Sequence, residues 1–140
     1  MANEFARNIQ DASLNPATFA LPTTASTSAT SAAIDLGADT VKPENVELEL
    51  SVPALTSVMN PAAATAGVTY IIETSTTSTF AAVARTIYSK NIAGSTGPTA
   101  ATTARCRIPS DSERYVRGKV TFGGTTADAS TLAAALTPRF

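Results

Sequence analysis

The sequence has 140 residues, which suits one domain that can bury a core without disulfides or metals. Its formal net charge of −1 argues against a general nucleic-acid or acidic-lipid binder, and the absence of His removes the commonest acid–base and metal-binding side chain. The single Cys excludes an intramolecular disulfide, no apolar run approaches a membrane span, and the N-terminus lacks a signal pattern, so we expect synthesis in a cytoplasm.

The first 30 residues do not resemble part of a domain core. Pro16 and Pro22 prevent a long helix, and residues 23–30 form a low-complexity run of Thr, Ser and Ala. Four apolar side chains are spaced among the polar ones: Phe5, Ile9, Leu14 and Phe19. We predict that residues 1–30 are an extended N-terminal arm whose apolar side chains anchor it on a neighbouring subunit or partner. The alternative is a frayed terminus.

From residue 31 onward, alternating polar and apolar residues predict short β-strands. The clearest is 46–52, where Glu47 and Glu49 should form a solvent-exposed acidic face opposite buried Val and Leu side chains. The run 68–75 has β-branched residues on both faces, which favours a central strand, and Phe80 should plug the edge of the core. The expected strands are 33–36, 46–52, 68–75, 83–89, 102–108 and 115–122, with 130–137 open between strand and short helix.

Six to eight short strands with no long helical pattern between them predict an all-β domain. We expect residues 31–140 to form an antiparallel β-sandwich of the jelly-roll type, carrying the arm at its N-terminal side.

The sequence offers little that indicates enzymatic chemistry. Only carboxylates and one thiol remain as possible side-chain ligands, and Asp35 and Asp39 match no calcium-loop pattern, so we expect no metal site. Cys106 lies between Arg105 and Arg107, but strand alternation should turn it toward the core, as a structural and unreactive residue. No glycine pattern fits a phosphate-binding loop, so we expect no enzyme and no cofactor.

A basic stripe is the remaining candidate site. It consists of Arg105, Arg107, Arg114, Arg117 and Lys119. The interpretations are a solvated face paired with Glu47 and Glu49, a protein–protein interface, or a nucleic-acid surface; the scarcity of interleaved aromatic residues disfavours the last.

Several short motifs, taken in order, resemble the jelly-roll capsid cement (decoration) proteins of tailed bacteriophages. They are Ile34-Asp35-Leu36-Gly37, the strand 46–52, Ile71–Ser75 followed by Phe80, Arg107-Ile108-Pro109 and Arg114–Arg117. The likeness covers most of residues 31–123, while residues 1–30 and the loop 53–67 depart from it.

The resemblance implies a structural protein without catalytic residues. It implies a homotrimer on the outer surface of the phage head that binds the major capsid protein and clamps its lattice after expansion. We therefore expect a virion location, with no nucleic-acid or membrane partner. The alternatives are another phage accessory protein, such as a head-fibre base or tail component, a receptor-binding β-module, a bacterial adhesin or pilus-like module, and, last, an enzyme.

Overall fold

A computed structural model describes residues 16–23, 28–37, 46–60, 67–83, 85–123 and 128–139. These residues form β-strands joined by turns and loops, and no helix long and apolar enough to cross a membrane occurs among them. The strands are β1 (Ala17–Ala20), β2 (Ser28–Thr30), β3 (Ile34–Asp35), β4 (Glu47–Val52), β5 (Val68–Ser75), β6 (Arg85–Ile92), β7 (Thr102–Arg107), β8 (Tyr115–Phe122) and β9 (Ala133–Arg139).

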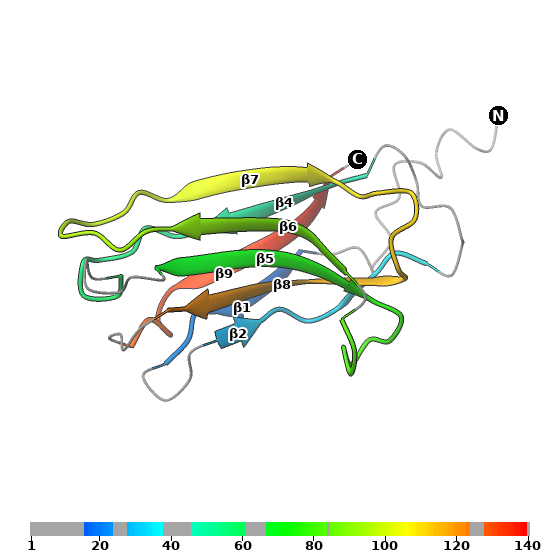
Figure 1. The fold of residues 1–140 in the computed structure, drawn as a ribbon, viewed down its shortest axis with the longest axis horizontal. Coiled ribbons are helices and arrows are strands. Elements are labelled where there is room, and N and C mark those ends of the chain that lie inside the picture. Colours follow the sequence, from blue (N-terminus) through cyan, green and yellow to red (C-terminus); the bar gives the residue numbers. More distant parts are fainter. Residues whose placement is uncertain are drawn as a thin grey trace.

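The strands form two antiparallel sheets that lie face to face (Figure 1). Sheet A has the order β1-β9-β4-β7, and sheet B has the order β2-β8-β5-β6, with the short β3 also paired to β8. The predicted all-β sandwich is confirmed.

The order of pairing is that of a jelly roll. β5 pairs with β6, β4 with β7, β2 and β3 with β8, and β1 with β9, so the pairs nest like those of one long hairpin. The hairpin then rolls up, because β9 also pairs with β4 and β8 also pairs with β5. Successive strands therefore alternate between sheets at several points, which places residues distant in the sequence side by side.

Alternation explains which faces meet in the core. The inward residues of β8 are Val116, Gly118, Val120 and Phe122, and all are buried. Val116, Val120 and Phe122 belong to one core cluster with the apolar residues of β4, and the 46–52 and 115–122 patterns predicted that these residues point inward. β5 has the predicted bounds and a central position between β6 and β8.

The beginning of the sandwich differs from our prediction. β1 and β2 lie within the predicted arm, yet they pair with β9 and β8 as edge strands. Phe19 is buried in the core, where its ring approaches Gly118 so closely that a Cβ there would lie 3.1 Å from Phe19 Cε1. Phe19 is therefore a core residue of its own chain, and the sandwich starts at Ala17 instead of residue 31.

The segment Ala133–Arg139 forms the last described strand. β9 is a strand in the centre of sheet A, between β1 and β4, so the short-helix alternative for 130–137 is wrong. Its alternating Ala134 and Leu136 are buried, while Ala135 and Thr137 lie on the other face.

Candidate functional site: the charged faces of the sandwich

The predicted basic stripe is divided between the two sheets. Arg105 and Arg107 lie on β7 of sheet A, whereas Arg117 and Lys119 lie on β8 of sheet B, and Arg114 precedes β8. The connection between β7 and β8 crosses from one sheet to the other, so residues close in sequence end on different faces. The prediction that these five basic residues form one continuous stripe is therefore wrong.

On sheet A, alternation places charged residues from three adjacent strands on the outer face. Leu48 and Leu50 of β4 are buried in the core, so Glu47 and Glu49 point to the opposite side. In register, Glu49 lies opposite Arg105 of β7, and Glu47 lies opposite Arg107 of β7 and Arg139 of β9. We call Glu47, Glu49, Arg105, Arg107 and Arg139 the arginine ladder.

Glu49 is the centre of this ladder. Its Oε2 accepts a hydrogen bond from Arg105 Nε at 2.7 Å, and its Oε1 accepts one from Arg139 Nη2 at 2.6 Å. These two arginines, Arg139 first, hold the pKa of the Glu49 carboxyl below its ordinary value. Arg107 Nε reaches Glu47 Oε1 at 3.4 Å, which is a longer and weaker contact.

The predicted wet acidic face on β4 is correct in direction, and the Glu47 side chain is 36% exposed, but the prediction of exposure is wrong for Glu49. Glu49 has only 6% of its surface exposed, although it lies on the outer face of the sheet. The arginine side chains approach it from β7 and β9, which explains how a carboxylate on an outer sheet face loses contact with water.

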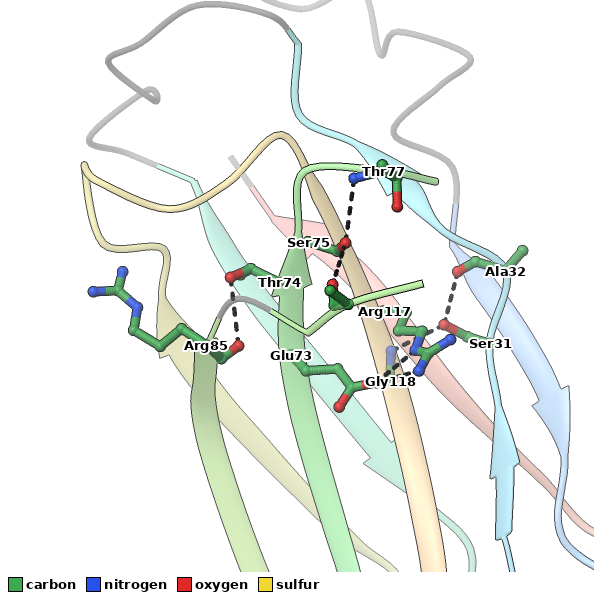
Figure 2. Close-up of polar contacts among 10 residues, drawn as sticks. Ser31, Ala32, Glu73, Thr74, Ser75, Thr77, Arg85, Arg117 and Gly118 are labelled. Atoms are coloured by element: carbon green, nitrogen blue, oxygen red, sulfur yellow. Dashed lines mark hydrogen bonds and ion pairs between the residues drawn. The ribbon is translucent and has the colours of Figure 1, made fainter. Parts of the chain in front are cut away.

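Sheet B carries an ion pair that is enclosed by other side chains. Glu73 of β5 lies opposite Arg117 of β8 in register, and Arg117 Nε donates to Glu73 Oε1 at 2.6 Å (Figure 2). The Arg117 guanidinium also lies over the Phe80 ring, 4.2 Å from its centroid, and Phe80 is buried. Phe80 was predicted to plug the core edge; it instead covers this ion pair and lies outside the main core cluster.

The loop from β5 to β6 is held in place by hydroxyl groups. Ser75 Oγ donates to the Ala82 carbonyl at 2.7 Å. It also accepts a hydrogen bond from the Thr77 N–H at 3.2 Å (Figure 2). Among the described residues, Phe80 alone combines a side chain with a positive φ, 52°. A bulky residue in this conformation is uncommon, so the loop closes at a conformational cost.

The remaining predicted residues have separate positions. Lys119 lies on the outer face of sheet B, opposite Ile71 of β5 and Thr30 of β2. Arg114 makes a bidentate pair with Asp35, at 2.9 and 2.7 Å. The proposed anchors Phe5, Ile9 and Leu14 lie outside the described residues.

Cys106 faces Leu48 across the β4–β7 pair and packs against the core, as alternation predicted. It is only half-buried, because β7 is an edge strand. Burial and the nearby Glu47 charge raise the pKa of the thiol to about 11. Within the part of the chain that the structure describes, no group of His, Cys, Asp and Glu side chains gathers to hold a metal ion.

Sequence analysis missed Arg139 as a member of the site. The signal was available in the alternation of Ala133, Ala135, Thr137 and Arg139, which places all four on one strand face. The unresolved choice between strand and helix for this segment concealed it.

Comparison with known proteins identifies no family. No protein-family model matches the sequence, and no curated protein matches it significantly. Among solved structures, the chain is similar to the K3 cleaved adhesin domain of Lys-gingipain from Porphyromonas gingivalis, with 14% sequence identity and a TM-score of 0.40. The similarity covers 79% of this chain and 58% of the adhesin domain, so the chain spans less than two thirds of that domain's length.

Proposed function

We propose that this chain is a capsid cement (decoration) protein of a tailed bacteriophage. It binds the outside of the head as a homotrimer and stabilises the expanded lattice of the major capsid protein. It acts by binding and not by catalysis, and its location is the outer surface of the virion after synthesis in the host cytoplasm.

The observation that carries the proposal is a sandwich whose outer face on sheet A bears an ordered array of ionic side chains. Glu49, Arg105 and Arg139 are held together by hydrogen bonds of 2.6–2.7 Å across three strands. A rigid sheet with fixed charges suits recognition of a repeating protein surface, because little conformational freedom is lost on docking. The jelly roll is also an architecture used by viral capsid domains, which is support by analogy only.

The proposed trimer has a physical reason. Three linked copies on one particle bind with an avidity that exceeds the affinity of each copy, without any new contact. Closed cyclic symmetry also matches a three-fold position in a shell.

The test is binding to particles. Purified protein mixed with expanded phage heads should co-sediment with them, and imaging should place it on the outer surface at three-fold or quasi-three-fold positions. Heads that carry the protein should release their DNA at a higher temperature than bare heads. The absence of binding to expanded heads, or a location on a fibre or tail, would refute the proposal.

Self-association is tested separately, by sedimentation of the purified protein. A mass of three chains at micromolar concentration is expected. A monomer or dimer mass would refute the trimer while leaving capsid binding to be measured on its own.

A further inference from the structure

The arginine ladder differs from the other ion pairs in its stoichiometry. Arg85 and Asp111 form a one-to-one pair, as do Arg114 with Asp35 and Arg117 with Glu73. In the ladder, three arginines share two carboxylates. The ladder is therefore the place, among the described residues, where arginine charge exceeds the charge of its paired carboxylates.

The ladder arginines also keep most of their hydrogen-bonding capacity. A guanidinium has five N–H donors, yet Arg105 and Arg107 each use only Nε in the ladder and Arg139 uses Nη2. Their side chains are 64%, 81% and 55% exposed, in that order. Donors suited to a further carboxylate therefore face solvent.

Glu49 fixes the geometry of two of these arginines. Its two oxygens each hold one guanidinium, from β7 and from β9, so that Arg105 and Arg139 are positioned without being fully satisfied. An arginine that is already positioned loses less side-chain entropy when it binds a ligand.

The spacing along the strand defines the form of the partner. Arg105 and Arg107 are two residues apart on β7, and alternate residues of a strand are separated by about 7 Å. The acidic side chains of a second extended segment repeat at the same interval when they occupy alternate positions.

We propose that the arginine ladder is the docking site for an extended segment of a partner protein with Asp or Glu at alternate positions, and that Glu49 acts as its positioning residue. This inference rests on the proposed function, since it specifies the chemistry by which the partner protein is recognised. Nucleic acid is the less suitable ligand, because the five residues of the ladder include no aromatic side chain on which bases could stack.

The test uses a synthetic peptide of alternating Glu and Thr, measured by calorimetry at low salt with the full chain. An alternating Lys–Thr peptide and a single-stranded oligonucleotide are the comparison ligands. The Glu–Thr peptide should bind best, and its affinity should fall as salt is raised to 1 M, where the screening length is about 3 Å. Arg105→Gln and Arg139→Gln should each weaken binding by about tenfold, and Arg114→Gln should not.

Two glutamate variants separate positioning from simple charge. Glu47→Gln and Glu49→Gln each add one unit of positive charge to the ladder, so a purely electrostatic surface would bind the acidic peptide more tightly in both. The proposed role of Glu49 predicts weaker binding by Glu49→Gln, with binding by Glu47→Gln unchanged or tighter. Circular dichroism of each variant verifies that the fold is retained.

The outcomes distinguish this inference from the proposed function. Tighter binding by both glutamate variants overturns Glu49 as the positioning residue. A preference for the oligonucleotide overturns the ladder as a carboxylate site, even if the protein still binds phage heads. If the protein binds the acidic peptide but does not bind expanded heads, the ladder is supported as a carboxylate site and the capsid role is refuted.

Discussion

At the scale of single residues, the Glu73–Arg117 pair shows how burial changes the value of an ion pair. Its side chains are 5% and 19% exposed, whereas those of Asp35 and Arg114 are 31% and 44% exposed. Removing one partner of a buried pair leaves a charge without water or a counter-ion, which costs far more than breaking an exposed pair.

We expect Arg117→Met to destabilise the protein by about 3–5 kcal/mol, because Glu73 would remain enclosed without its partner. The matched change Arg114→Met, in an exposed pair, should have a much smaller effect on stability, because water replaces the lost partner. Urea denaturation measures both. The double variant Glu73→Gln/Arg117→Met should recover part of the loss; equal effects of the two single changes would contradict the role of burial.

The Cys106 thiol should react slowly. Burial, and then the charge of Glu47, raises its pKa from 9.0 to about 11, so the thiolate fraction at pH 8 falls by about a hundredfold. A thiol reagent should therefore label the native protein about a hundredfold more slowly than the denatured protein. Comparable labelling rates in the two states would show that the edge of the sandwich opens freely around Cys106.

The same shift predicts a loss of stability in alkali. The unfolded thiol ionises near pH 9, whereas the folded thiol resists ionisation until about pH 11. Because the folded pKa is raised, this contribution to the free energy of unfolding is fully present below pH 9 and is lost as the pH rises toward 11. Replacing Cys106 with Ala should remove this part of the pH dependence, as followed by denaturation at pH 8 and pH 10.5.

At the scale of elements, the two edges of the sandwich are protected differently. At one edge, β1 and β2 are short, with four and three residues, which leaves little backbone for another chain to pair with. At the other edge, β6 and β7 have eight and six residues (Figure 1). Long open edge strands risk pairing with other molecules unless a local device prevents it.

Lys90 protects the edge at β6 from pairing with another strand. It lies opposite the buried Tyr70, so its side chain starts on the inner face of β6, and its Nζ donates to Thr102 Oγ1 of β7 at 3.2 Å. A charged side chain that turns inward at an edge discourages the approach of another strand. The irregularity between Ile72 and Glu73 in the β5–β6 register interrupts the same edge.

We expect Lys90→Val to increase self-association beyond the native oligomer, because it removes the charge and leaves an apolar edge strand. Light scattering during incubation at 37 °C measures this. Lys119→Val makes the same change in charge on the central strand β8, where no edge is uncovered, and should aggregate less. Equal aggregation of both variants would attribute the effect to net charge alone.

Elements with strong internal patterns could be predicted from the sequence. The alternation in β8 and the β-branched run of β5 fixed their bounds, and the all-β class followed from them. β1 could not be found this way, because its four residues carry one buried side chain, Phe19, whose position depends on Gly118 in another sheet. The pairing of Arg105 and Arg107 with Glu49 and Glu47 was among the interpretations that the sequence allowed, and the structure shows it. Arg139 was missed, because it joins the ladder only when β9 becomes a neighbour of β4.

At the scale of the whole molecule, the part of the N-terminal region that the structure describes belongs to the sandwich. Residues from Ala17 onward close one edge of each sheet, and Phe19 and Leu21 are buried in the common core. The arm that we predicted to anchor on a partner is therefore reduced to the segment that precedes β1, with Phe5, Ile9 and Leu14 as its remaining apolar candidates.

Two truncations separate these roles. Removing residues 1–22 takes away β1 and two buried side chains, each worth about 1.5–3 kcal/mol of burial, so this variant should unfold at a much lower temperature or fail to fold. Removing residues 1–15 leaves every described strand in place, so its melting temperature should match that of the full chain. Under the proposed function, the shorter deletion should still associate with itself but occupy expanded phage heads less completely, because the arm's apolar contacts are lost. Equal occupancy by the 1–15 deletion and the full chain would refute the arm as an anchor, and would leave the sandwich itself, with its arginine ladder, as the binding surface.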